Sequence, residues 1–137
     1  MTNEEPGRIV ALPKIHDPRG NLTVAEPTGA LPFHIGRTYW LYDVPAGESR
    51  GGHAHRECME LIVATGGSFR VTLDNGRSRR TYLLNRPYEG LLVPTMTWRT
   101  LEDFSAGAVC LVLASHAFSE ADYIRVYEDY MAEVCPK

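Results

Sequence analysis

Hydrophobic residues occur along most of this chain in short segments, in which apolar side chains either alternate with polar ones or form a brief continuous run. Alternation with a period of two is typical of strands with one buried face, and short apolar runs suit strands buried on both faces. The segments predicted to form strands are Arg8–Ile15, Asn21–Glu26, Arg37–Val44, Met59–Thr65, Ser68–Leu73, Arg80–Leu84, Gly90–Pro94, Trp98–Leu101 and Val109–Ala114. Many short strands separated by turn residues indicate an all-β sandwich or barrel.

Two local signals refine this pattern. Asn75-Gly76 lies between two predicted strands and predicts a hairpin with a type I′ turn, which needs positive φ at both central residues. Near the C-terminus, the stretch from Ser119 to Asp122 resembles a helix capping box. The apolar positions that follow it at helical spacing are Ile124, Tyr127, Met131 and Val134. We therefore expect one short C-terminal helix, packed on the outside of the β structure.

The composition favours a single soluble domain. The chain has 137 residues, of which 44% are hydrophobic, so residues 1–137 fit one domain with a sizeable core. The net charge of -3, with scattered Lys and Arg, gives no footprint for nucleic acid or a membrane surface. Cys58, Cys110 and Cys135 are odd in number and lack metal-binding spacing, which favours a reducing compartment. Because no signal or membrane-spanning segment is evident, we expect a cytoplasmic protein with no nucleic-acid or membrane partner.

The most distinctive motif is His53-x-His55, in which both imidazoles share one face of a predicted strand. Imidazole titrates near neutrality, so the pair suits either a metal site or proton transfer. With Gly47 before it and Glu60 and Gly67 after it, the spacing resembles the first signature motif of the cupin superfamily. The resemblance implies a small single-domain cupin jelly-roll barrel, all-β with a short C-terminal helix.

In metal-dependent cupins the two histidines and the glutamate of this motif bind a metal ion, with a third histidine from a second motif. In this chain Arg99 stands at the position of that third histidine, five residues after Pro94. A guanidinium has no lone pair to donate and would repel a divalent cation. A metal-dependent enzyme that uses His53, His55 and Glu60 as ligands is therefore the alternative, and acid/base catalysis without metal is the preferred interpretation.

A more specific resemblance extends from about Arg8 to Tyr130. The chain is similar to the nucleotide-sugar 3,4-ketoisomerases, the WxcM-like small cupins that act on dTDP-4-dehydro-6-deoxyglucose. The segments that carry the resemblance are Asp17–Leu22, Arg37–Asp43, Arg50–Arg56, Gly66–Val71, Trp98-Arg99, Asp103–Ser105, Leu113–Ser115 and Asp122–Arg125.

The resemblance implies an isomerase that moves the keto group of this dTDP-sugar from C4 to C3, giving a dTDP-3-dehydro-6-deoxyhexose for deoxy-amino-sugar biosynthesis. The C3 proton is acidified by the C4 carbonyl, and its removal gives an enediolate that is reprotonated at C4. One base can carry the proton between the two carbons. We assign His53 as that base, with His55 positioning it or moving a proton between the two oxygens. Tyr39 is predicted to donate to the developing oxyanion.

The resemblance also implies a set of substrate-binding residues and no cofactor or metal. Those residues are Arg19, Arg37, Arg50, Glu60, Trp98, Arg99 and Asp103. Guanidinium groups suit the diphosphate or the enediolate, although Arg19 in a turn fits a solvated surface position equally well. Trp98 suits either a wall of the pocket or a place in the core. Arg19 resembles one subgroup of the family and Arg99 another, so the configuration of the product at C4 stays open.

Small cupins commonly add an N-terminal strand to a neighbouring subunit, which covers an exposed sheet edge. We therefore expect a homodimer with two-fold symmetry, in which Arg8–Glu26 is the exchanged region.

Overall fold

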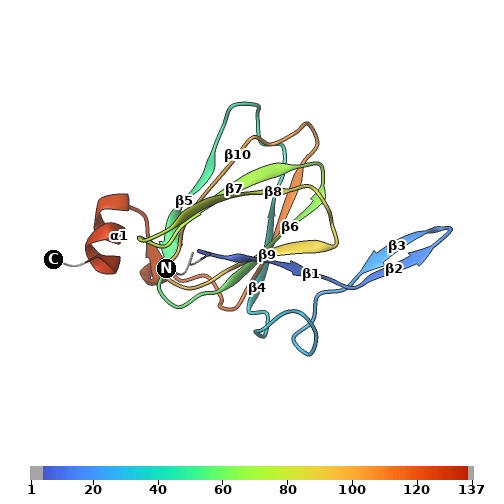
Figure 1. Ribbon diagram of the computed structural model, residues 1–137, viewed down its shortest axis with the longest axis horizontal. Helices are drawn as coiled ribbons and strands as arrows, with labels where there is room; N and C mark the ends of the chain where they lie inside the picture. Colours follow the sequence, from blue (N-terminus) through green and yellow to red (C-terminus); the bar gives the residue numbers. More distant parts are fainter. Residues whose placement is uncertain (1–4, 136–137) are drawn as a thin grey trace.

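The computed structural model describes residues 5–135, and most of the strands in it belong to two antiparallel sheets (Figure 1). The first sheet has the order β1 (Arg8–Ala11), β9 (Glu89–Val93), β6 (Glu60–Gly66), β11 (Val109–Ala114) and β4 (Arg37–Leu41). The second has the order β12 (Tyr123–Ile124), β5 (Arg50–His55), β10 (Trp98–Glu102), β7 (Phe69–Asp74) and β8 (Arg79–Leu84). The fold is therefore all-β, as predicted, and the two sheets pack face to face.

The main core fills the space between the two sheets. Along β6, Ile62 and Ala64 face this core, whereas Leu61 and Val63 pack on the other side of the sheet against a second cluster. This alternation follows from the pleat of the strand. Glu60, at the start of β6, shares the face of Ile62 and Ala64 and therefore points into the space between the sheets.

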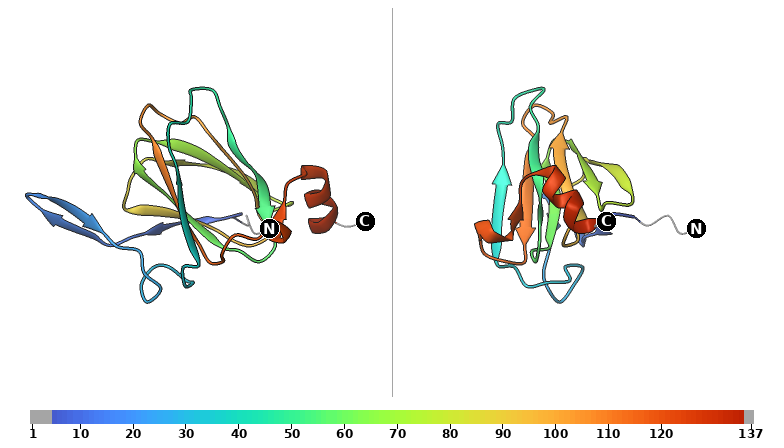
Figure 2. Two further views of the ribbon diagram at one scale, coloured as in Figure 1. Left: turned by 180° about the vertical axis from the view of Figure 1, so that it is seen from behind. Right: turned by 90° about the vertical axis from the view of Figure 1, so that its left-hand side faces the viewer.

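The N-terminal region differs from the prediction. The expected strand Arg8–Ile15 is divided, because it is interrupted at Pro13, which has no N–H to donate to a ladder. Its first part is β1, and its second part is β2 (Lys14–Asp17). β2 pairs with β3 (Gly20–Thr23) in a separate two-stranded hairpin, which projects away from both sheets at the end opposite the C-terminal helix (Figures 1 and 2).

The hairpin at Asn75-Gly76 forms, but its turn is not type I′. Asp74 pairs with Arg79, which leaves a four-residue loop, and of the two predicted central residues only Gly76 has a positive φ, of 90°. The Asn75 side chain instead accepts hydrogen bonds from the backbone N–H groups of the third and fourth loop residues, at 2.9 and 2.8 Å. An Asn that bonds its own loop in this way stabilises a longer turn.

The C-terminal helix is present but begins later than predicted. Residues Glu120–Asp122 form a short 3₁₀ helix, η1, in which Ser119 makes no side-chain capping bond. β12 follows, and the α-helix α1 covers Tyr127–Val134. Its buried Tyr130 donates to the backbone carbonyls of Asp74 and Met96, which fixes α1 against the second sheet. The expected capping box is therefore wrong, and Asp122 is available for another role.

Two further expectations concern the whole chain. All three cysteines are free, and Cys58 and Cys110 are buried. None of the helices within residues 5–135 has the length and apolar character needed to cross a membrane.

Candidate active site

A cavity of about 330 Å³ lies between the two sheets and is lined by residues of β4, β5, β6 and β10. Its volume falls in the range of small-molecule sites. Six of the polar side chains predicted for the site line it, namely Arg37, Tyr39, Arg50, His53, Glu60 and Arg99. Strands far apart in the sequence thus bring most of the predicted site together.

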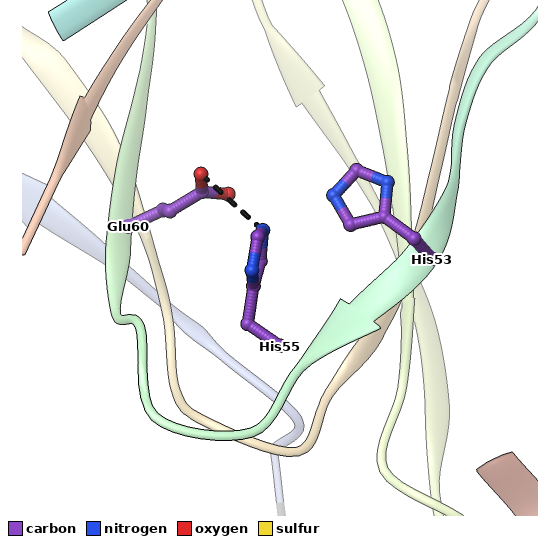
Figure 3. Close-up of side chains that lie close together, drawn as sticks. All are labelled: His53, His55 and Glu60. Carbon is purple, nitrogen blue, oxygen red and sulfur yellow. Dashed lines mark ion pairs between the residues drawn. The ribbon is translucent and has the colours of Figure 1, made fainter. Parts of the chain in front are cut away.

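The two histidines lie on one face of β5, but at different depths. Their ring centroids are 4.9 Å apart and the rings are nearly perpendicular. His53 lines the cavity, whereas His55 is completely buried beside Glu60 (Figure 3). The Nε2 atom of each ring is buried without a hydrogen-bond partner. The shared face is as expected, but only His53 is placed to touch a ligand directly.

The environment keeps both imidazoles neutral. Burial, followed by the nearby Arg99 and His55, lowers the pKa of His53 to about 3. Burial and Arg99 also lower the pKa of His55, against the opposing effects of Glu60 and Asp122. These shifts differ from the near-neutral titration expected of a free imidazole, because burial disfavours the charged form. At neutral pH each ring therefore has a lone pair ready to accept a proton.

Glu60 connects the polar groups of the cavity. Arg99, only 2% exposed, forms a buried ion pair with Glu60 Oε1, and the Tyr39 hydroxyl donates to Glu60 Oε2 at 3.0 Å. Arg37 Nη2 lies 4.0 Å from the same Oε2 atom, and His55 Nε2 lies 3.6 Å from it. One carboxylate thus links two cations, a phenol and an imidazole.

Tyr39 is held as a proton donor. Burial and the charge of Glu60 raise the pKa of its phenol far above the ordinary value of 10.0. A phenol that stays protonated can donate a hydrogen bond to an oxyanion forming in the cavity.

The metal-binding alternative would need free donor atoms on His53, His55 and Glu60. Ligand atoms of His53, His55 and Glu60 lie within 4.8 Å of one another. However, Arg99 occupies Glu60 Oε1 and Tyr39 donates to Oε2. The permanent charge of Arg99 would repel a divalent cation from this position. The residues present therefore do not fit a divalent metal ion.

Three predicted residues lie elsewhere. Trp98 is adjacent to Arg99 on β10, so the pleat directs it to the opposite face; there its ring packs against Tyr127 and Tyr130, with centroids 5.3 and 5.6 Å away. Trp98 therefore does not line this cavity and packs against α1 instead. Asp103 lies in an exposed turn after β10, where it pairs with Arg70 at 3.4 Å. It does not contact the cavity.

Arg19 is also outside the cavity of its own chain. It lies in the turn between β2 and β3, where its side chain is 89% exposed and bonds to Asp17 at 2.9 Å. A role in substrate binding would require the hairpin to reach a different molecule.

Two residues of the site were absent from the set predicted for it. Tyr123 and Arg125 both line the cavity, and the Tyr123 ring lies 5.0 Å from the His53 ring. Arg37 donates to the Tyr123 hydroxyl at 3.3 Å. The segment that carries them, Asp122–Arg125, was part of the family resemblance, which was the available signal. They were missed because β12 joins β5 only in the folded chain.

The arrangement can bind an anion and move protons. Four guanidinium groups line the cavity, from Arg37, Arg50, Arg99 and Arg125, and Glu60 neutralises only part of this charge. Guanidinium groups bind phosphate oxygens in fixed geometry. A neutral base and a phenol donor face the same space, as acid/base chemistry on a phosphorylated substrate requires.

Comparisons with known proteins agree with this chemistry. The family model described as FdtA, WxcM-like, C-terminal, matches residues 5–135. The TDP-4-oxo-6-deoxy-alpha-D-glucose-3,4-oxoisomerase of Aneurinibacillus thermoaerophilus is 38% identical over 123 residues, which cover 90% of this chain and 88% of that protein.

Solved structures of 3,4-ketoisomerases are also similar to this chain. A 3,4-ketoisomerase from Helicobacter canadensis superposes with a TM-score of 0.92 at 36% identity, covering 96% of this chain and 98% of that one. A mutant of the 3,4-ketoisomerase QdtA from Thermoanaerobacterium thermosaccharolyticum, in complex with TDP-4-keto-6-deoxyglucose, has a TM-score of 0.92 at 32% identity, covering 98% of this chain and 96% of that one. The chain therefore belongs to the FdtA, WxcM-like family, whose characterised relatives include TDP-sugar 3,4-ketoisomerases.

Proposed function

We propose that this protein is a TDP-4-keto-6-deoxyglucose 3,4-ketoisomerase, which moves the keto group from C4 to C3. The observation that carries the proposal is the neutral His53, whose unpartnered Nε2 is buried at a cavity that also contains the Tyr39 phenol and several guanidinium groups. The named activities of the relatives support the choice of substrate.

His53 removes the C3 proton and returns a proton to C4. The C4 carbonyl acidifies the C3 proton, so a neutral imidazole is a strong enough base once the resulting charge is stabilised. Removal of the proton forms the enediolate across C3 and C4. Delivery of a proton to C4 completes the isomerisation, and the carbonyl group is then at C3 instead of C4.

Tyr39 and Arg99 stabilise the enediolate. When the substrate reacts, the single O–H of Tyr39 turns from Glu60 to the developing oxyanion, and the fixed charge of Arg99 lies in the same cavity. Because Arg99 is already held by Glu60 and the Thr97 carbonyl, it needs little rearrangement when the charge forms.

The second proton, from the C3 hydroxyl to the C4 oxygen, passes through Glu60 and His55. Glu60 lines the cavity, and its Oε2 lies 3.6 Å from His55 Nε2. His55 accepts the hydroxyl proton by way of Glu60 and returns it to the C4 oxygen. This assignment gives the two histidines separate tasks.

The remaining cations hold the diphosphate of the nucleotide. Arg50 and Arg125 line the cavity and are exposed in part, so they can reach a ligand that extends toward solvent. The reaction proceeds by acid/base chemistry without a metal ion, because Arg99 and Tyr39 already bind the two oxygens of Glu60 that a metal ion would need. The 3-keto product is suited to amination. A cytoplasmic location is supported by the three free cysteines, which suit a reducing compartment.

The active unit is a homodimer in which the β2–β3 hairpin, within the region Arg8–Glu26, is exchanged between subunits. Ile15 and Leu22 are paired across this hairpin and are 56% and 54% exposed. β4 is an edge strand, and its Trp40 is 56% exposed. Pairing of these surfaces would cover an open sheet edge and bring Arg19 to the partner subunit.

Incubation of the pure protein with TDP-4-keto-6-deoxyglucose tests the activity. A coupled 3-aminotransferase traps the product, and NMR of the sugar identifies the position of the keto group. We expect a 3-keto product, with the couplings of H4 giving its configuration. Recovery of only the 4-keto sugar in the presence of the trap would contradict the proposal.

A further inference from the structure

We propose that Asp122 is a positioning residue of the active site, which fixes the tautomer of His55 so that its Nε2 lone pair points toward Glu60. The proposal rests on the proposed function, in which His55 carries a proton. It gives a task to the carboxylate that the sequence had suggested was a helix cap.

The contact between the two side chains is direct and buried. Asp122 Oδ2 lies 3.0 Å from His55 Nδ1, and the two side chains are 13% and 0% exposed. A carboxylate only accepts hydrogen bonds, so the ring nitrogen that faces it must carry the hydrogen. In the neutral ring the lone pair is then on Nε2, which has no other partner.

The backbone around Asp122 holds the carboxylate in place. Its second oxygen, Oδ1, accepts the backbone N–H of Glu57 at 2.7 Å. Its own N–H bonds the carbonyl of Ser119 at 3.1 Å, and its carbonyl accepts from Arg56 at 2.9 Å. The next residue, Tyr123, pairs with His55 across β12 and β5. Asp122 is therefore anchored to the residues that directly follow the strand carrying the histidine.

The direction of the Nε2 lone pair of His55 matters because the Glu60 carboxylate lies opposite it. His55 Nε2 is 3.6 Å from Glu60 Oε2, which also accepts the Tyr39 hydroxyl. With hydrogen on Nδ1, Nε2 can take up a proton that arrives through Glu60. With hydrogen on Nε2, the ring would donate to Glu60 and could not accept that proton. Asp122 thus selects the tautomer that can act, as carboxylates beside functional histidines commonly do.

Asp122→Asn tests this with little change of shape. The amide oxygen can still accept from the Glu57 N–H, while its NH₂ group now donates to His55 Nδ1 and drives the ring hydrogen to Nε2. The matched control is Glu133→Gln, which removes an exposed carboxylate that pairs with Arg56. Asp122→Glu keeps the charge and should restore part of the activity.

The readouts are ¹⁵N NMR of the His55 ring, TDP affinity by calorimetry, and turnover. In Asp122→Asn we expect the hydrogen on Nε2, a kcat lower by about 10- to 100-fold and an unchanged Kd for TDP. Glu133→Gln should match the wild type in all three. An Asp122→Asn protein that keeps hydrogen on Nδ1, or changes tautomer with unchanged kcat, would overturn the proposal. An inactive wild type would instead contradict the proposed function, and the tautomer measurement would still decide whether Asp122 sets the state of His55.

Discussion

At the scale of single residues, the site depends on charged groups that are buried in pairs. Glu60 and Arg99 are 1% and 2% exposed, and each is the main charge partner of the other. Removing one member of a buried pair is costly, because the remaining charge has lost both water and its partner. Among the residues that line the cavity, Glu60 is the one carboxylate beside four guanidinium groups, a balance that would favour an anionic ligand.

We therefore expect Glu60→Ala to lower the free energy of unfolding by about 3–5 kcal/mol. Asp103→Asn removes the charge from an exposed ion pair, in which the Asp103 side chain is 68% exposed, and asparagine tolerates the positive φ of 56° at this position. Such a pair contributes less than about 1 kcal/mol. Urea denaturation measures both variants. Equal losses of the free energy of unfolding in the two variants would contradict a larger contribution from the buried pair.

His53 predicts a pH dependence of stability. Its pKa is lowered from 6.5 to about 3 in the folded protein, so between these values the unfolded chain binds more protons than the folded one. The free energy of unfolding should therefore be highest above pH 6.5 and fall as the pH decreases toward 3. One such group contributes up to about 1.4 kcal/mol per pH unit in that interval.

Urea denaturation at several pH values between 7 and 4 tests this dependence. His53→Asn removes the titrating group and should make the fall with pH less steep. His34→Asn changes an exposed histidine and serves as the control. If His53→Asn leaves the slope as steep as in the wild type, His53 is not held neutral by the fold.

At the scale of elements, an irregularity in the pairing of strand β5 places His53 at the cavity. The register with β10 shifts so that Arg99 pairs with His53 and Thr100 with Gly51. Gly51 and Gly52 both have positive φ, at 88° and 69°. Bulges of this kind turn a strand and redirect its side chains, and they are frequent beside active sites.

Gly51→Ala should be the more damaging of the two possible alanine substitutions. Both variants carry the backbone strain of a left-handed alanine, about 1–2 kcal/mol. At Gly51 the new Cβ would also lie 3.0 Å from the Arg99 carbonyl oxygen, whereas at Gly52 nothing lies within 4 Å. We expect a larger loss of stability and of turnover in Gly51→Ala, measured by denaturation and kcat. Equal effects would rule out a positioning role for this contact.

Elements with a regular pattern could be predicted, and those set by distant contacts could not. Alternation identified most strands, and the i, i+2 spacing of His53 and His55 placed both imidazoles on one face of a strand. That Glu60 faces them from the other sheet is seen only in the folded chain. Trp98 was assigned two roles because the sequence does not say which face of β10 is the cavity. The local sequence predicts a helix-capping role for Asp122. Its actual partner, His55, is distant in the sequence and contacts it only when β12 pairs with β5.

At the scale of the whole molecule, the β2–β3 hairpin forms its own small sheet and projects away from the two main sheets (Figure 1). We expect Ile15→Glu combined with Leu22→Glu to convert the proposed dimer to a monomer, because two charges replace the apolar pair of the hairpin. Leu83→Glu, at a 46% exposed position on β8, is the control and should stay dimeric. Analytical ultracentrifugation at micromolar concentration measures the oligomeric state of both variants. A monomeric wild type would contradict the proposed exchange of the hairpin between subunits.

In the proposed mechanism His53 carries the proton between C3 and C4. This step is tested most directly by following TDP-4-keto-6-deoxyglucose in deuterated water by NMR, with the wild type and His53→Asn, while calorimetry gives the affinity for TDP. We predict that the substitution lowers isomerisation and deuterium incorporation by about 10²- to 10⁴-fold and leaves TDP binding intact. If the His53→Asn protein incorporates deuterium into the sugar and isomerises it at the wild-type rate, His53 does not carry this proton.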